Sequence, residues 1–286
     1  INKIPPIIFP GIIFFNIESV LKKFIIMRIV FIGAGNVATN MAMALRKSGH
    51  EIVQVYSRTK ESAEELAHQA VAEPITQLNR IIADADIYFL AVKDDVINEV
   101  LSSFPHNNVF LVHTAGSVSM DVLKDQTSDY GVFYPLQTFT KDWFSNFTNI
   151  PLCIEANTDK NLNVLGEIAE ELSNNVYHID SMQRLYLHVA AVFACNFTNY
   201  MFASAENILQ NHDISFNVLK PLIRETVDKA LVHSPSRSQT GPAIRGDRET
   251  IEKHLDLLSH TKKLQNLYRF VSDSIMDYYQ SERRND

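Results

Sequence analysis

Residues 27–58 read MRIVFIGAGNVATNMAMALRKSGHEIVQVYSR, and this stretch decides the fold of the N-terminal half. The apolar run Ile29–Ile32 is short enough for a buried strand. A helical pattern follows it and ends at Gly49, and a second apolar run at 52–56 completes a strand–helix–strand unit. In that context the G-x-G-x-x-A turn between the first strand and the helix predicts dinucleotide binding. The turn consists of Gly33, Ala34, Gly35, Asn36, Val37 and Ala38.

Each small residue of this turn has a physical role in the prediction. Gly33 allows the chain to turn tightly, and Gly35 allows the backbone to approach a pyrophosphate at the N-terminus of the helix. Ala38 replaces the third glycine of the motif and still permits close packing of the helix on the strand. The alternative is a strand–turn–helix unit that binds no nucleotide.

The end of the second strand indicates which dinucleotide binds. NAD sites place an acidic residue there for the ribose 2′-hydroxyl, but residues 56–60 contain no acid. Arg58 can pair with a 2′-phosphate, and Ser57 and Thr59 can donate hydroxyl hydrogen bonds. We therefore expect NADP as the cofactor. The alternative is a surface arginine beside the N-cap of a helix.

Composition narrows the class of protein. The chain has 286 residues, 46% of them hydrophobic, which supports a real core and one large or two ordinary domains. A net charge of −7 argues against broad nucleic-acid binding, which needs a basic face. The two cysteines are far apart and form no metal spacing, and the chain has no zinc-protease, dithiol or P-loop motif. We expect a cytoplasmic protein without a bound metal.

The first 26 residues precede the first methionine, Met27. Their apolar run 7–15 is interrupted by Pro10 and Gly11 and is too short for a transmembrane helix. Lys22 and Lys23 follow the run, whereas a signal peptide carries its positive charge before it. We expect 1–26 to be translated upstream sequence that is not native to the protein. The rival interpretation is a membrane-touching anchor.

Alternation of apolar runs and helical patterns continues to about residue 180. Buried strands are predicted at 86–92, 109–113 and 132–134, with further strands at 151–155 and 176–179 around a helix at 162–172. This predicts an α/β Rossmann fold, with a doubly wound and mostly parallel sheet. From residue 181 the pattern is helical, at 182–211, 214–233, 247–259 and 262–280. We expect an NADP-binding domain at 27–180 and an all-α substrate and dimerisation domain at 181–286.

Ligands of open parallel sheets bind at the carboxyl ends of the strands. That rule selects three groups of residues. Ala91, Val92 and Lys93 would pass near the nicotinamide ribose, and Thr114 and Gly116 follow the next strand. Beside them, His113 is a candidate proton donor, or alternatively a strand-end histidine bonded to backbone, and Tyr134 is either a site residue or a buried tyrosine before a proline.

The helix predicted from residue 182 carries a polar stripe on an otherwise apolar surface. At 100° per residue, Arg184, His188, Cys195, Asn196 and Asn199 lie within 120° of one another. His188 could donate a proton to a substrate, because histidine titrates near pH 6.5, at about neutral pH. Asn196 and Asn199 could orient a carbonyl. The alternative is a hydrogen-bond network between helices.

A later loop, 241–247, supplies a third candidate. Arg245 could bind a substrate carboxylate, and Asp247 is a good N-cap for the helix after it. Capping alone explains Asp247, so the functional hypothesis rests on Arg245.

These motifs together resemble a bacterial family of Rossmann-like NADP oxidoreductases with an uncharacterised helical C-terminal domain. The N-terminal half is also similar to the NADP-binding domain of pyrroline-5-carboxylate reductase, 6-phosphogluconate dehydrogenase and 3-hydroxyacid dehydrogenases. The resemblance covers most of 27–286 and implies the Rossmann fold, NADP and a homodimer whose helices interlock. It rests on Gly33-x-Gly35-x-x-Ala38, Ser57-Arg58, 90–95, 113–116, 134–139, Asn196-Phe197-x-Asn199 and 241–247.

One departure from the related hydroxyacid dehydrogenases matters. They carry a catalytic lysine on the first helix of the second domain, but this chain has no lysine between residues 161 and 219. Arg184 cannot replace it as a base, because arginine stays protonated. Imine reduction, or proton transfer by a histidine, therefore fits better than their mechanism. We favour His188 over His113.

Two classes of function follow from the sequence. The first is an NADP-dependent oxidoreductase that acts on a small carbonyl, imine or hydroxy substrate between the two domains. The second is a non-catalytic NADP-binding or sensor protein with the same fold. A proton donor near the nicotinamide distinguishes the enzyme from the sensor.

Overall fold

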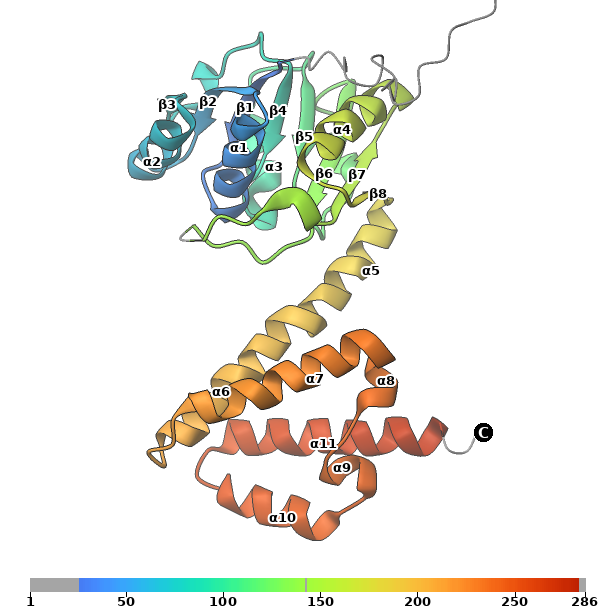
Figure 1. Cartoon of the computed structure of the whole chain (residues 1–286). Helices are drawn as coiled ribbons and strands as arrows, with labels where there is room; N and C mark the ends of the chain where they lie inside the picture. The colour runs from blue at the N-terminus through green and yellow to red at the C-terminus, as the bar shows by residue number, and fades with distance from the viewer. Residues whose placement is uncertain (1–25, 142, 283–286) are drawn as a thin grey trace, which may run out of the picture. The chain divides into compact units, whose positions relative to one another are not determined.

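The computed structural model describes residues 26–141 and 143–282, and it contains one eight-stranded sheet (Figure 1). The expected upstream segment 1–26 therefore falls almost wholly outside the described residues. The strands are β1 (Arg28–Ile32), β2 (Glu51–Tyr56), β3 (Glu73–Ile75), β4 (Ile87–Leu90), β5 (Phe110–His113), β6 (Asp129–Pro135), β7 (Leu152–Ala156) and β8 (Val176–His178).

The sheet has the order β3-β2-β1-β4-β5-β6-β7-β8. Strands β1 to β6 are all parallel, β7 pairs antiparallel with β6, and β8 pairs parallel with β7. The chain order reverses between β1 and β4, which is the switch point at which a doubly wound sheet opens a crevice for ligands. The predicted Rossmann fold with a mostly parallel sheet is confirmed.

Helices cover both faces of this sheet, as a parallel sheet requires. Along β1, Ile29 and Phe31 belong to one hydrophobic cluster and Val30 and Ile32 to another, because successive side chains point to opposite faces. The first cluster lies under α1 (Asn36–Lys47), α2 (Lys60–Ala70) and α4 (Asp159–Leu172). The second lies under α3 (Ile97–Ser103) and the 3-10 turn Leu78–Arg80.

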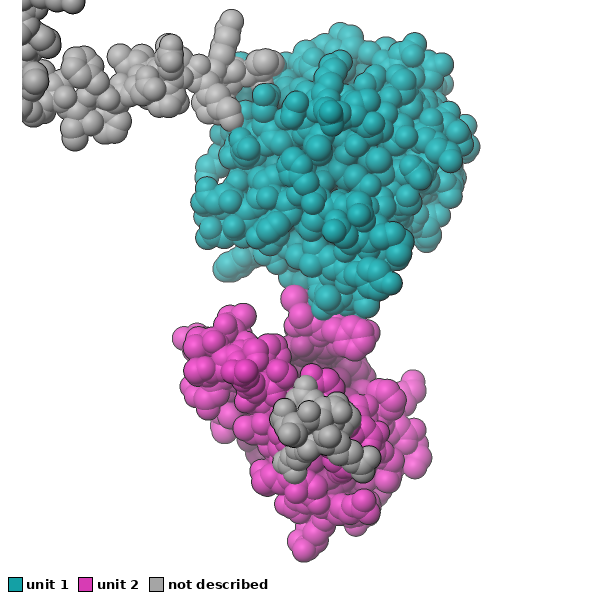
Figure 2. Space-filling model, turned by 90° about the vertical axis from the view of Figure 1, so that its right-hand side faces the viewer, with its two compact units in different colours: residues 1–192 teal, residues 193–286 magenta. Residues whose placement is uncertain are grey.

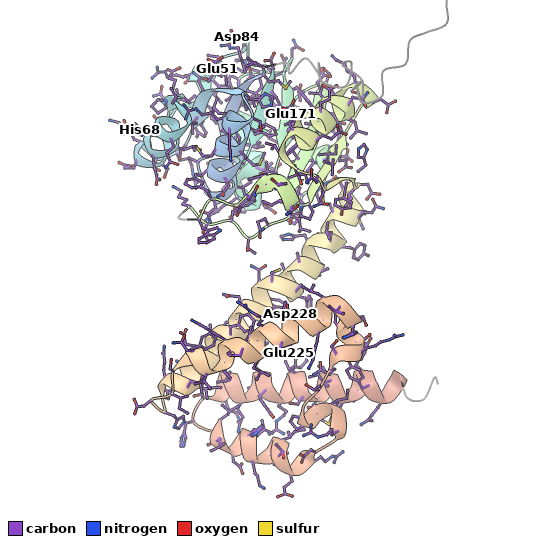
Figure 3. All side chains as sticks on the ribbon, viewed as in Figure 1. Glu51, His68, Asp84, Glu171, Glu225 and Asp228 are labelled. Carbon is purple, nitrogen blue, oxygen red and sulfur yellow. The ribbon has the colours of Figure 1, made fainter. Side chains whose placement is uncertain are left out.

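The C-terminal part is helical, as predicted. Its elements are α5 (Ser181–Ala191), a π-helical segment (Val192–Phe197), α6 (Thr198–Gln210), α7 (Lys220–His233), α8 (Pro235–Ser238), α9 (Pro242–Arg245), α10 (Arg248–Leu257) and α11 (Lys262–Glu282). A small cluster of Ala243, Ile251 and Leu255 packs against side chains of α11. Glu225 and Asp228 lie on α7 (Figure 3).

The chain forms two compact units, residues 1–192 and 193–286 (Figure 2). The division falls at the π-helical segment, twelve residues after the boundary predicted between 180 and 181. Helix α5 therefore belongs with the sheet and not with the helical unit. No helix among the described residues is long and apolar enough to cross a membrane.

The turn between β1 and α1 depends on a glycine for steric reasons. Gly33 has φ of +120°, and a Cβ added there would lie 2.2 Å from the carbonyl oxygen of Ala91. Its N–H donates to the carbonyl of Tyr56 at 2.8 Å, which joins the turn to β2. Gly35 differs, because a Cβ there would meet nothing within 4 Å.

Gly33→Ala and Gly35→Ala make a matched pair of substitutions. We expect Gly33→Ala to lower the free energy of unfolding by roughly 2 kcal/mol or more, because it combines an unfavourable φ with a backbone clash. Gly35→Ala should change stability by less than about 1 kcal/mol. Urea denaturation of both variants measures the difference. Equal stability of the two variants would contradict the steric account.

Candidate active site

The N-terminus of α1 leaves room and donors for an anion. Gly35 is the N-cap and supplies no capping side chain, and its carbonyl accepts from Thr39 at 2.9 Å. Among the described residues, the backbone N–H groups of Asn36, Val37 and Ala38 find no acceptor. Three free donors at the positive end of a helix, with open space where a Cβ would be, suit a pyrophosphate.

The side chain of Asn36 does not point its amide at this space. Its Nδ2 donates to the carbonyl of Phe139 at 2.9 Å. One turn later, Asn40 donates to the carbonyl of Thr140 at 3.0 Å and accepts from the backbone N–H of Ser145 at 3.1 Å. These bonds hold the segment after β6 against α1, which the sequence pattern did not reveal.

The residues predicted to recognise the 2′-phosphate follow the carboxyl end of β2. Arg58 is exposed, and no described residue forms an ion pair with it. Ser57 accepts from the backbone N–H of Thr59 at 3.4 Å, and Thr59 is the N-cap of α2 without a side-chain capping bond. The site suits a phosphate group, because it combines the unpaired guanidinium of Arg58 with the hydroxyls of Ser57 and Thr59 at the N-terminus of α2.

The predicted nicotinamide-side residues follow β4 and β5. The backbone N–H of Ala91 donates to Ile32 at 2.8 Å, and that of Thr114 donates to Leu90 at 3.2 Å, so both turns are continuous with the sheet. Val92 is half-buried and Lys93 is exposed. These two turns lie side by side at the carboxyl edge of β1, β4 and β5, where the cofactor of a Rossmann fold would extend.

A tyrosine–histidine pair stands at this same edge. The hydroxyl of Tyr134, on β6, lies 3.0 Å from Nδ1 of His188, on α5. The two rings pack edge to face, with centroids 6.1 Å apart at 72°. Both residues are half-buried, and burial raises the pKa of Tyr134 to about 12, so its hydroxyl keeps its proton at neutral pH.

Gly116 fits the space beneath the pair. A Cβ at this position would lie 2.7 Å from His188 Nδ1 and 2.9 Å from Tyr134 Cζ. Gly116 was predicted as a cofactor residue, and the structure supplies a different reason for glycine: the pair packs directly on its backbone. Beside it, the hydroxyl of Ser117 hydrogen bonds to the carboxylate of Asp94.

An ion pair inside the first unit positions α5. Arg184 is completely buried, and its guanidinium donates to Glu155 at 2.5 Å and to the carbonyl of Val118 at 2.6 Å. Ser181 donates to Glu155 at 2.8 Å and accepts from the backbone N–H of Met120 at 2.9 Å. These bonds join α5 to β7 and to the turn after β5, and His188 follows Arg184 by one helical turn.

His113 lies inside the protein and not in the site. It is completely buried, its Nδ1 accepts from the backbone N–H of Ala115 at 3.1 Å, and burial is the main reason that its pKa falls to about 3. Its neighbour Arg184 lowers that pKa further. A neutral and fully buried ring is poorly suited to proton donation. For His113 the structure therefore favours the alternative, a strand-end histidine bonded to backbone.

The polar stripe is also corrected in its geometry. The 100° spacing assumed a regular α-helix, but Cys195 and Asn196 lie in the π-helical segment, which changes the phase. Arg184 is buried and His188 half-buried, whereas Cys195, Asn196 and Asn199 are exposed within the chain. The residues of the predicted polar stripe therefore differ in burial and helix type, and only Arg184 and His188 belong to the first unit.

The remaining predicted substrate residues lie in the second unit. Asn199 lines a groove of about 650 Å³ between α6 and α7, together with the charged residues Glu206, Lys220 and Arg224. Arg245 ends α9, its side chain is mostly exposed, and its nearest carboxylate is Asp247 at 3.9 Å. Asp247 accepts from the backbone N–H of Thr250 at 3.1 Å, which confirms the predicted cap.

Among the described residues, no group of three or more histidine, cysteine or acidic side chains is placed to hold a metal ion.

Comparison with known proteins agrees with these two parts. The family described as NADP oxidoreductase coenzyme F420-dependent matches residues 28–116, and a domain of unknown function, DUF2520, matches residues 150–275. The "putative NADP oxidoreductase BF3122" of Bacteroides fragilis is 44% identical, with a TM-score of 0.83 over 88% of this chain and 98% of that chain. The chain belongs to the family of that protein. The recognition of an NADP oxidoreductase family with a helical C-terminal domain is thereby confirmed.

More distant structures share the fold. An imine reductase from Myxococcus stipitatus, solved with NADP+, is 18% identical, with a TM-score of 0.61 over 90% of this chain and 94% of that chain. Pyrroline-5-carboxylate reductase from Streptococcus pyogenes is 13% identical, with a TM-score of 0.58 over 88% and 98%. No curated protein sequence matches the chain.

The burial of His113 predicts a dependence of stability on pH. The unfolded chain binds a proton at this histidine below about pH 6.5, whereas the folded protein leaves it neutral down to about pH 3. Stability should therefore fall as the pH falls through this window. Between pH 6.5 and 4.5, the protonation of His113 in the unfolded chain should lower the free energy of unfolding by roughly 2 kcal/mol.

His113→Asn tests this prediction, because its amide oxygen can still accept from Ala115 but does not titrate. Between pH 6.5 and 4.5 the free energy of unfolding should fall by about 2 kcal/mol less in the variant than in the native chain. Urea denaturation across that range gives the two slopes. Parallel slopes would show that His113 is protonated in the folded protein too.

Proposed function

We propose that this chain is an NADP-dependent oxidoreductase that reduces a small carbonyl or imine, or oxidises the corresponding hydroxy compound. The observation that carries the proposal is the Tyr134–His188 pair beside Gly116, at the carboxyl edge of the sheet that the glycine turn also faces. Hydride transfer leaves a substrate atom that must take a proton, and a half-buried histidine can supply it. A sensor would not need such a group.

Support for NADP comes from the residues and from the family. The free N–H groups of Asn36, Val37 and Ala38 suit the pyrophosphate, and Arg58 with Ser57 and Thr59 suits the 2′-phosphate. When bound, the cofactor supplies or accepts the hydride. Ala91, Val92, Lys93, Thr114 and Gly116 remain the residues proposed to flank its nicotinamide end.

The chemistry of α5 favours carbonyl or imine reduction with a histidine as proton donor. Arg184 occupies one turn of the helix with a purely structural set of bonds, and His188 occupies the next. We assign proton donation to His188, and we retain Asn196, Asn199 and Arg245 as proposed substrate-binding residues. Their polar side chains are exposed on the second unit and suit a small substrate with a carbonyl or carboxylate.

Turnover decides whether the protein is an enzyme. The purified full chain with NADPH is screened against keto acids, aldehydes and cyclic imines by the loss of absorbance of the reduced nicotinamide. The proposal expects one of these classes to be reduced, with His188→Ala lowering kcat by about 10² or more, in the range of general acid catalysis. NADPH binding without turnover on any class would favour the sensor.

Arg58→Ala tests cofactor identity. We expect it to weaken NADPH binding by roughly 1–3 kcal/mol and to leave NADH binding nearly unchanged, because only NADPH carries the 2′-phosphate. Lys60→Ala is the matched control, since Lys60 is a nearby cation that pairs with Glu64 at 3.5 Å. Calorimetry with both cofactors measures the effect. Tighter binding of NADH than NADPH by the native chain would refute NADP.

We also propose that the chain forms a homodimer through its helical part. Large apolar side chains are exposed along the helices, more than a surface helix normally carries. They include Tyr186 and Val189 on α5, Phe193 and Phe197 in the π-helical segment, Tyr200 on α6, and Leu222, Leu231 and Val232 on α7. A second copy of the same chain would cover them.

Light scattering at micromolar concentration tests the dimer. The proposal expects twice the chain mass of 32.5 kDa. Phe193→Glu should shift the protein toward the monomer, because it would bury an unpaired charge, whereas Trp143→Glu, an exposed aromatic elsewhere, should not. A native monomer would end the proposal.

The thiols accord with a cytoplasmic location, which we also propose. Cys153 is buried and Cys195 exposed, and neither forms a disulfide. A reducing compartment preserves such thiols.

A further inference from the structure

We propose that Tyr134 is a positioning residue for His188: its hydroxyl holds the imidazole so that the proton of the neutral ring sits on Nε2, the nitrogen that faces away from the tyrosine. The role of Nε2 toward a substrate rests on the proposed function, whereas the state of the ring does not.

The hydrogen bond itself indicates the tautomer. Tyr134 Oη and His188 Nδ1 lie 3.0 Å apart, and neither atom has another hydrogen-bond partner among the described residues. A neutral imidazole has one donor nitrogen and one acceptor nitrogen. If Nδ1 carried the proton, the half-buried tyrosine hydroxyl would accept and its own proton would lack an acceptor. Donation from Oη to Nδ1 satisfies both groups, and it leaves the ring proton on Nε2.

Burial, together with the groups around the pair, keeps the tyrosine protonated. Burial is the largest cause that raises the pKa of Tyr134, Cys153 and the carboxylate of Asp94 raise it further, and Arg184 opposes them. Arg184 is itself compensated by Glu155 at 2.5 Å. His113, on the neighbouring strand, is held neutral by its own burial. The hydroxyl is therefore protonated in the neutral range, and it donates to Nδ1 of the neutral ring.

The position of the ring is fixed from three sides. The Tyr134 ring meets it edge to face, and the backbone of Gly116 lies under Nδ1, without room for a methyl group. The backbone of α5 is held by the bonds of Arg184 to Glu155 and Val118. A flip of the imidazole would replace Nδ1 by a carbon and break the only hydrogen bond that this pair makes in the described chain. Nε2 is thus the nitrogen left for a ligand.

Nitrogen NMR of the full chain tests the proposal without a substrate. The protein is labelled with ¹⁵N-histidine and observed at about pH 8.5, where ordinary histidines are neutral, and the His188 signals are assigned by their loss in His188→Ala. We expect an unprotonated Nδ1 and a protonated Nε2 in the native chain. In Tyr134→Phe both nitrogens should move toward the averaged shifts of a mixture of tautomers.

Tyr130→Phe is the matched control, because Tyr130 is on the same strand and its hydroxyl makes no described hydrogen bond. It should leave the His188 signals unchanged. Gly116→Ala is a second, independent variant, whose methyl group displaces the ring, and it should also disturb them. A native His188 protonated at Nδ1, or signals unmoved by Tyr134→Phe, would overturn the proposal.

With a substrate from the screen, Tyr134→Phe should lower kcat about ten-fold or more and leave the KM for NADPH nearly unchanged. Equal kcat values for the variant and the native chain would contradict a positioning role. If no substrate or NADPH binding is found, the proposed function fails, while the NMR result still decides the state of the ring.

Discussion

The placement of α5 on the sheet depends on one buried cation. Arg184 is completely enclosed, and a guanidinium cannot lose its charge, so its surroundings must supply acceptors. Glu155 on β7 and the carbonyl of Val118 after β5 do so at 2.5 and 2.6 Å. Helix α5, strand β7 and the turn after β5 are thereby joined, although they are distant in sequence. A shift of any one of them would expose the charge or leave it without an acceptor. Burial of such a pair need not add stability, but it specifies where the helix lies.

This constraint explains why the compact units divide at residue 192 and not at the start of the helix. The first turns of α5 are fixed by Arg184, by the bonds of Ser181 and by the capping box of Asp180 and Gln183. Directly after them the backbone widens into the π-helical segment Val192–Phe197. A π-helical insertion weakens the regular hydrogen-bond ladder and is frequent at functional sites. The change of helix type therefore coincides with the end of the region that the ion pair holds.

The sequence was sufficient for the fold because periodicity and turn chemistry are local properties. The apolar runs of β1, β4 and β5 and the glycines at 33 and 35 identify the strands and the nucleotide turn without tertiary information. The candidate site was less predictable. A π-helical segment leaves no local mark in the sequence, so the residues that the 100° spacing placed on one stripe differ in burial and helix type. The Tyr134–His188 hydrogen bond joins residues 54 positions apart, and the local sequence around either residue does not predict the contact.

Helix α5 carries a structural residue, Arg184, and the proposed proton donor, His188. Arg184 and His188 are four residues apart and so lie on the same face of α5, one turn from each other. The two terminal nitrogens of Arg184 bind Glu155 and Val118, whereas its buried Nε has no partner among the described residues. A lysine there would lack the fork of donors that reaches both acceptors. A lysine would therefore not replace Arg184 in this packing, and the histidine that we propose as proton donor lies one turn further along the helix. That histidine needs a partner to fix its ring, and β6 provides one in Tyr134, at the strand end where Gly116 makes room for both.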